Sequence, residues 1–509
     1  MVAAPHDARS RLRAHLHETR LLGAIHSALY YDQNTVMPAA GAAWRGEQLA
    51  LLAGQLHQRQ SSDAYGELVA AAEEELPADA PAAPRRNLEL LRLELNRQRC
   101  LDPALVRQLA QAQARGNAIW QEARRCDDFA AFAPCLAELI RLRREQASQL
   151  ESAEPEPRSP WEILAQPFEP GISKQRLTAL FTPLERELPG LLETARALPQ
   201  IQPSEPPELP EALQESLCRR LLESWGYDPS RCQRSRSSHP FSCTLGPADF
   251  RITTRVVPGQ PLAAFLATAH EWGHSLYEQG LPRSEDHYFP WPLGEATSMA
   301  VHESQSLFWE CRLARSRAFA ARWHGAFCPE GAGDPWGGPH GFWRALNPMR
   351  PGLIRVEADE LSYGLHIVLR YELELALIEQ EMPVEELPSR WNRRMQELLG
   401  VTPTSDARGC LQDIHWAEGL FGYFPSYALG HLISAQLAVS MGEALGSLEE
   451  RIAAQEEEEI RRWLSREVWC LGRSVTAEEL VEQVSGRPLE PGPFLHYLSA
   501  KLEQLASGT

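Results

Sequence analysis

Hydrophobic positions recur at helical spacing along most of this chain. Between residues 8 and 30 they return about once per helical turn, for example at Leu12, Leu16, Leu22 and Ile25, which predicts an amphipathic helix. Similar spacing predicts further helices at 44–58, 104–122, 129–150, 177–198, 211–225, 262–279, 295–317, 353–380, 384–399, 427–441, 448–464, 477–484 and 493–505. Proline-rich stretches such as 201–210 separate them, because proline interrupts helices. We therefore expect a mostly α-helical protein.

Residues 231–255 depart from this helical pattern. They are polar and β-capable, and the alternation of apolar and polar residues at 249–255 predicts a strand. Because a predicted helix follows at residue 262, this one small sheet would form a wall of a cleft beside that helix. Residues 327–341 are rich in glycine and proline, so we expect them to be irregular.

The helix predicted at 262–279 contains His270-Glu271-Trp272-Gly273-His274. Two histidines four residues apart point the same way from a helix, so both imidazoles can bind one cation. A glutamate after the first histidine can act as general base on a water molecule at that cation, as in the HExxH pattern of zinc peptidases. On its own the pattern leaves a second interpretation open, an amphipathic helix with two partly buried histidines.

A third metal ligand is expected, because catalytic zinc usually has three protein ligands and one open position. Glu303 follows His274 by 29 residues, which is enough for a loop and an antiparallel second helix. The apolar neighbours Ala300, Val301 and Leu307 favour an inward side chain over a surface carboxylate.

The amino-acid composition argues against several classes of function. The net charge of -18 argues against general binding to nucleic acids or to anionic membranes. The chain has no apolar run long enough to span a membrane and no apolar N-terminal signal segment. Its ten cysteines are scattered without a CxxC pair, which is typical of reduced thiols. A cytoplasmic protein is therefore expected.

Six further motifs, in the same order along the chain, resemble those of one known family. They lie at residues 31–38, 239–241, 249–253, 302–305, 354–359 and 409–416. With the pattern at 270–274, they make the chain similar to the carboxypeptidase Taq family of zinc metallocarboxypeptidases. The resemblance implies a helical, zincin-like fold with a deep active-site cleft. It also implies one catalytic domain over 1–509, in which the helical part at about 1–150 is one wall of the cleft, and a homodimer.

The resemblance also implies roles for the metal-binding segments. One Zn²⁺ per chain would bind His270, His274 and Glu303, with Co²⁺ or Mn²⁺ as possible substitutes, and Glu271 would be the general base. Asp359 or Asp413 could orient the histidines, although a salt bridge between helices is the alternative for each.

Substrate contacts are expected from a second group of residues. Tyr423 is the first candidate to stabilise the oxyanion, with His415 or Tyr427 as alternatives; a core tyrosine remains possible. For a carboxylate anchor, Arg355 is the first candidate and Arg251 and His239 follow. Arg355 could instead pair with Asp359, four residues on.

We expect hydrolysis of the C-terminal bond of peptides that have a free C-terminus. A zinc endo-oligopeptidase or dipeptidyl peptidase is the alternative, because the metal chemistry would be the same. A metal-binding scaffold without activity is disfavoured, since the base and all three ligands are present. Two departures from the family pattern, Trp272 and a longer loop at 280–294, bear on substrate preference.

Overall fold

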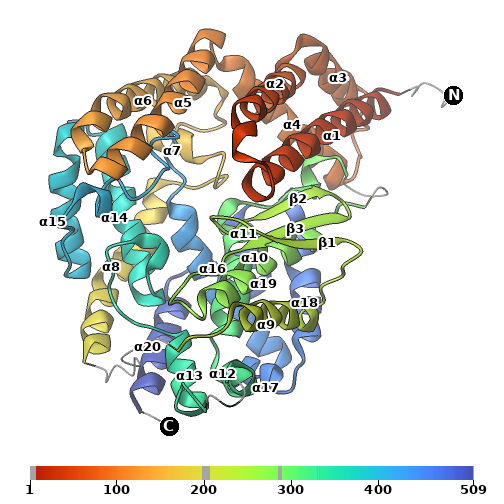
Figure 1. Ribbon diagram of the computed structural model, residues 1–509. Coiled ribbons are helices and arrows are strands. Elements are labelled where there is room, and N and C mark those ends of the chain that lie inside the picture. The colour runs from red at the N-terminus through yellow and green to blue at the C-terminus, as the bar shows by residue number, and fades with distance from the viewer. Residues whose placement is uncertain (1–6, 198–206, 285–288, 329–330, 332, 508–509) are drawn as a thin grey trace.

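The computed structural model describes residues 7–197, 207–284, 289–328, 331 and 333–507 (Figure 1). It confirms a mostly helical fold. The helices before the sheet are α1 (Ala8–Thr35), α2 (Ala42–Ser61), α3 (Asp63–Glu74), α4 (Ala82–Cys100), α5 (Pro103–Cys126), α6 (Phe129–Leu150), α7 (Pro160–Ala165), α8 (Lys174–Arg196) and α9 (Glu211–Ser224). Those after it are α10 (Ala263–Gly280), α11 (Met299–Leu307), α12 (Arg317–Trp323), α13 (Gly338–Leu346), α14 (Glu360–Ile378), α15 (Leu387–Leu399), α16 (Pro425–Leu445), α17 (Leu448–Ala453), α18 (Glu457–Glu467), α19 (Ala477–Ser485) and α20 (Gly492–Ser507). Most of the predicted loop at 201–210 lies outside the described residues.

Two helices begin later than the hydrophobic spacing predicts, because polar side chains cap them. Ser298 accepts a hydrogen bond from the Val301 N–H at 3.2 Å, so α11 begins at Met299 and not at residue 295. Asp359 accepts from the N–H groups of Leu361 and Ser362, so α14 begins at Glu360 and not at residue 353.

The small sheet is present where it was predicted. It contains β1 (Cys232–Arg236), β2 (Ser242–Gly246) and β3 (Asp249–Thr254) in the order β1-β3-β2, with β1 parallel and β2 antiparallel to β3. Phe250, Ile252 and Thr254 of β3 are buried, as expected for alternate residues of a strand that packs on a helix. That helix is α10, which β3 contacts directly.

The N-terminal helices form a separate layer above the sheet (Figure 1). α1, α3 and α4 share a small hydrophobic cluster, to which Trp291 from the segment after α10 also belongs. A much larger cluster extends from α5 and α6 through α10, α14 and α16 to α20. Within the described ranges, every helix is too short or too polar to cross a bilayer.

Candidate metal centre and active site

The central helices α10 and α11 bring two histidines and a glutamate together. His270 and His274 lie one turn apart on α10, and Glu303 faces them from α11. Glu303 Oε2 lies 3.8 Å from His270 Nε2 and 3.4 Å from His274 Nε2. All three side chains are mostly buried, and one donor atom of each lies within 4.8 Å of the others.

This donor set fits a zinc ion. With bonds of about 2.0–2.2 Å to nitrogen and oxygen, donors around a tetrahedral zinc ion lie about 3.3 Å apart. The observed separations of 3.4 and 3.8 Å need little adjustment. Burial alone would raise the pKa of Glu303, but His270 and His274 lower it to about 2, so this carboxylate is ionised at neutral pH.

The second ring nitrogen of each histidine, Nδ1, contacts another group of the protein. His270 Nδ1 lies 2.9 Å from Glu310 Oε2, and His274 Nδ1 lies 3.1 Å from the His302 carbonyl oxygen. Arg315 in turn holds Glu310 Oε1 at 2.7 and 3.0 Å. These contacts leave both Nε2 atoms facing Glu303, as metal-binding histidines require.

The suggestion that Asp359 or Asp413 orients the histidines was wrong. The Asp359 carboxylate caps α14, and the Asp413 carboxylate pairs with Arg355 and Arg370. Glu310 was missed, although it follows Glu303 by seven residues and therefore lies on a similar helix face. It belongs to a π-helical turn, Phe308–Ala314, that continues α11.

Changing Glu310 to glutamine is expected to weaken metal binding about 10–100-fold, because an amide orients His270 less firmly than a charged carboxylate. A competition titration against a coloured chelator measures this affinity. Glu458, an exposed glutamate on α18, provides the control substitution to glutamine. Equal affinities in the two variants would show that Glu310 does not support the centre.

Two glycines allow the helices of the site to approach closely. A Cβ on Gly273 of α10 would lie 2.7 Å from Ser306 Cα, so α10 and α11 meet backbone to backbone at this point. A Cβ on Gly430 of α16 would lie 2.8 Å from Glu303 Cγ. Gly430 thus leaves room for the Glu303 side chain beside α16.

Replacing Gly430 by alanine is expected to weaken metal binding about tenfold or more, since overpacking of about 1–3 kcal/mol would displace Glu303. Gly442 on the same helix has open space around it, so its change to alanine is the matched control. That control should retain metal affinity and gain about 0.5–1 kcal/mol of helix stability. Metal titration and thermal unfolding of both variants measure the difference, and a normal affinity for Gly430→Ala would contradict it.

Trp272 points away from the metal centre. Its indole N–H donates to the Trp225 carbonyl at 3.1 Å, its ring contacts Tyr227, and its side chain is fully buried. The unusual residue inside the histidine motif therefore packs α10 against the end of α9. The 280–294 loop falls partly on residues 285–288, which lie outside the described ranges.

Glu271 lies on the same turn of α10 as His270 and is buried. Burial raises the pKa of its carboxyl to about 7, against the opposing effect of His270. A carboxyl group with such a pKa can both accept and donate a proton near neutral pH.

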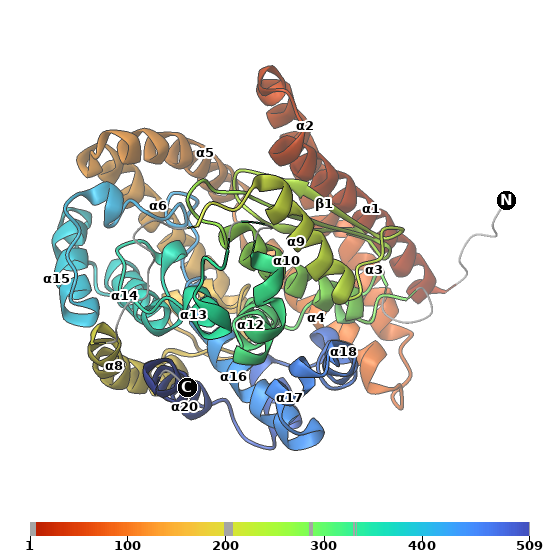
Figure 2. The same cartoon turned by 60° about the horizontal axis from the view of Figure 1, so that its bottom comes forward.

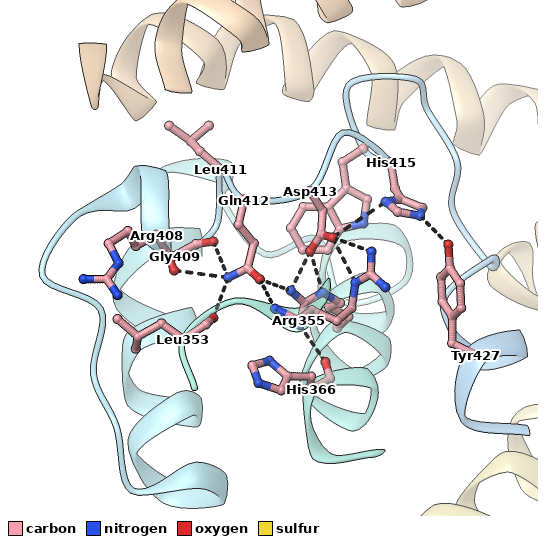
Figure 3. A network of polar contacts seen from close by, with 12 residues as sticks. Leu353, Arg355, His366, Arg408, Gly409, Leu411, Gln412, Asp413, His415 and Tyr427 are labelled. Atoms are coloured by element: carbon pink, nitrogen blue, oxygen red, sulfur yellow. Dashed lines mark hydrogen bonds and ion pairs between the residues drawn. The ribbon is translucent and has the colours of Figure 1, made fainter. Parts of the chain in front are cut away.

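A second group of candidates comes together at the start of α16. His415 Nε2 lies 3.2 Å from the Tyr427 hydroxyl (Figure 3). The Tyr423 ring lies beside both side chains. The Arg355 guanidinium lies over the Tyr427 ring at 4.7 Å. Burial, followed by the charge of Glu303, raises the pKa of Tyr423 to about 12, so its phenol remains a hydrogen-bond donor.

Arg355 is buried and already bound within the protein. Its Nε and Nη2 contact Asp413 at 3.0 and 2.9 Å (Figure 3). Its Nη1 donates to the Tyr363 hydroxyl at 3.0 Å. The suggested pairing with Asp359 was therefore wrong. The guanidinium has five N–H donors, so these contacts do not use them all.

The other two anchor candidates lie on the sheet side. Arg251 of β3 forms a two-point ion pair with Asp249, both contacts at 2.8 Å, and lies over the Tyr31 ring. His239 is exposed between β1 and β2. The structure thus places Arg355, and not these two residues, with His415 and the tyrosines.

Two buried glutamates that the sequence interpretation missed hold the loops around the site. Glu169 accepts hydrogen bonds from the Ala300 N–H and from the Ser426 hydroxyl, which joins the starts of α11 and α16. Glu374 accepts from Gly422 N–H at 2.9 Å and from two tryptophan indoles, beside the loop that carries Tyr423. For Glu374 the sequence signal was a glutamate in the apolar stretch that forms α14, whereas Glu169 lies in the turn between α7 and α8 and had no such signal.

Comparison with known proteins decides the family. The sequence model of the carboxypeptidase Taq (M32) metallopeptidases matches residues 11–502. The chain belongs to this family. Thermostable carboxypeptidase 1 of Thermus thermophilus is 36% identical to it, over 98% of this chain and 99% of the relative. Carboxypeptidase 1 of Bacillus subtilis is 32% identical over 94% of each chain.

A solved structure agrees with this assignment. The crystal structure of the M32 carboxypeptidase from Deinococcus radiodurans R1 matches with a TM-score of 0.93 at 31% identity, over 98% of this chain and 99% of that one. This carboxypeptidase Taq family member is therefore a metallocarboxypeptidase, a metal-dependent peptide hydrolase. The resemblance, the fold class and the reaction class that we expected from the motifs are confirmed.

Proposed function

We propose that this metallocarboxypeptidase binds one Zn²⁺ at His270, His274 and Glu303 and removes C-terminal residues from peptides. The observation that carries the proposal is the convergence of the two Nε2 atoms and a Glu303 oxygen within 4.8 Å. When bound, zinc lowers the pKa of a water molecule to about 7 and polarises the scissile carbonyl. Co²⁺ or Mn²⁺ would substitute at such a nitrogen and oxygen site.

Glu271 acts as the proton carrier. Its carboxylate takes a proton from the attacking water molecule and then donates it to the leaving amine. A buried carboxyl with a pKa of about 7 suits both steps. Glu303 and the two histidines supply one negative charge between them, which leaves the centre positively charged for the reaction.

Tyr423 donates a hydrogen bond to the oxyanion that forms at the scissile carbonyl. Its phenol keeps its proton near neutral pH, since its pKa is about 12. Tyr427 and His415 contact each other beside it and are the alternative donors.

Arg355 binds the free carboxylate of the peptide through the N–H groups that Asp413 and Tyr363 leave available. Its place beside His415 and Tyr427 supports this role. Arg251 and the exposed His239 remain secondary candidates. The Nε and Nη2 atoms of Arg251 are already bound to Asp249.

We also propose one catalytic unit over residues 1–509, with the N-terminal helices as one cleft wall. A cavity of about 700 Å³ lies between α1 and α4 on one side and β2 and Glu278, near the end of α10, on the other. It supports the packing of the N-terminal helices against this side of the unit, although the proposed metal ligands and Glu271 are not among its lining residues. Large hydrophobic residues exposed on α1 and α2, including Ile25 and Trp44, support a homodimer, which light scattering tests. The ten free cysteines support a cytoplasmic location.

A peptide-ladder experiment tests the reaction. The purified protein is incubated with a mixed peptide pool, with and without a chelator, and the products are followed by mass. We expect losses of one residue at a time from the C-terminus that stop on chelation. Peptides with an amidated C-terminus should resist cleavage; rapid internal cleavage of these peptides would instead support the endo-oligopeptidase.

A further inference from the structure

Helices α12 and α13 lie side by side (Figure 2). Between the end of α12 and the start of α13 lies a second group of side chains that could hold a metal ion. It consists of His324, Cys328 and Asp334, which share no residue with the proposed catalytic centre. His324 begins the turn that follows α12, Cys328 comes directly after that turn, and Asp334 precedes α13. The family motifs and the proposed function account for none of these residues.

The three donor atoms converge on one point. Cys328 Sγ lies 3.6 Å from His324 Nε2 and 3.6 Å from Asp334 Oδ1, and these last two atoms are 2.9 Å apart. Around a tetrahedral zinc ion, sulfur lies about 3.5–3.6 Å from nitrogen or oxygen donors, and nitrogen lies about 3.3 Å from oxygen. Only the His324–Asp334 separation has to open, by about 0.4 Å.

A catalytic relay of cysteine, histidine and aspartate does not fit this geometry. In such a relay the histidine contacts the nucleophile through one ring nitrogen and the carboxylate through the other. Here Cys328 Sγ and Asp334 Oδ1 both contact His324 Nε2. Without an ion these atoms form hydrogen bonds, and Cys328 Sγ also lies 3.4 Å from the His324 carbonyl oxygen; their arrangement around one point is the one that a shared metal ion needs.

The surroundings hold these side chains in place. Asp334 also accepts hydrogen bonds from the Trp336 N–H at 2.9 Å and the Gly338 N–H at 2.6 Å. The indole of Trp336 donates to the Phe327 carbonyl at 3.0 Å, and both aromatic rings are buried against Phe342. The apolar core therefore positions both ends of the segment that carries the ligands.

We propose that His324, Cys328 and Asp334 bind a second divalent ion, Zn²⁺, whose fourth position is open to water. A thiolate, an imidazole and a carboxylate are all zinc donors, and the thiolate selects against Mg²⁺ and Ca²⁺. On binding, the Cys328 thiol releases its proton to solvent as the sulfur–metal bond forms. With one thiolate and one carboxylate as ligands, the bound ion would carry no net charge and would join the turn after α12 to the segment before α13.

Metal content of the full-length enzyme tests the proposal. After exposure to Zn²⁺ and desalting, wild-type protein should retain about two zinc ions per chain, and Cys328→Ser about one. Cys470→Ser, which changes an exposed cysteine elsewhere, is the matched control and should retain both. Unchanged peptidase activity in Cys328→Ser would verify that this variant is folded. Equal zinc content in the two variants would overturn the proposal.

Cobalt provides a readout that is specific to the sulfur ligand. The catalytic ligands are two histidines and a glutamate, so thiolate-to-Co²⁺ charge-transfer absorption in the near ultraviolet would report the second site alone. We expect this absorption in wild type and Cys470→Ser but not in Cys328→Ser.

An alkylation experiment tests the site without a variant. Bound Zn²⁺ should slow the modification of Cys328 by iodoacetamide, as followed by peptide mass. Equal modification rates with and without Zn²⁺ would contradict the site.

Discussion

Replacing Glu271 by glutamine is expected to lower kcat for peptide hydrolysis about 10²–10⁴-fold. Glutamine has almost the shape of glutamate but can neither take a proton from the attacking water nor deliver one to the leaving amine. The proposed ligands His270, His274 and Glu303 are unchanged, so metal content should stay at the wild-type value. KM should change little, because the loss concerns the transition state and not the binding of the peptide.

The measurement pairs steady-state kinetics on a short peptide with metal analysis of the same samples. Glu67→Gln on α3 is the control, because it removes one exposed carboxylate far from α10 in the sequence and should leave kcat unchanged. A Glu271→Gln enzyme that keeps its metal and retains wild-type kcat would exclude Glu271 as the proton carrier. A variant that loses its metal would instead show that Glu271 supports the ligands.

Local spacing was enough to predict the elements around the proposed metal centre. His270 and His274 share a helix face because they are four residues apart, and the apolar neighbours of Glu303 indicated its inward direction. These relations lie within single helices, where the 3.6-residue period fixes which side chains point together. The three side chains meet only because α10 and α11 approach closely at Gly273. The spacing within α10 does not identify α11 as the helix that packs there.

Contacts between distant segments could not be predicted in this way. Asp359 lies one turn from Arg355 and was the obvious local partner, but its carboxylate is used as the cap of α14. The true partner, Asp413, follows Arg355 by 58 residues and comes from a loop. The cluster of His324, Cys328 and Asp334 was missed for a similar reason. Its residues lie in and beside a segment for which the sequence predicted only irregular, glycine- and proline-rich structure.

Replacing Asp413 by asparagine is expected to lower the free energy of unfolding by about 3–5 kcal/mol. One carboxylate oxygen contacts Arg355 at 2.9 Å (Figure 3). The other contacts the Nε of Arg370 at 2.7 Å. Both guanidinium groups are buried, so removing the negative charge leaves two cations in the core without compensation. Chemical denaturation of both proteins measures the loss. Asp63→Asn, at an exposed ion pair with Arg99, is the control and should cost at most about 1 kcal/mol.

The pH dependence separates this charge effect from a simple loss of packing. Burial alone would raise the pKa of Asp413, but Arg370 and Arg355 hold it well below the ordinary aspartate value. A lowered native pKa means that the stabilisation is present above the unfolded-state pKa of about 3.9 and is lost as the pH falls below it. The stability difference between wild type and Asp413→Asn should therefore be constant from about pH 5 to 7 and should narrow in stronger acid. A difference that stays constant into strong acid would assign the effect to packing and hydrogen bonds and not to the ion pairs.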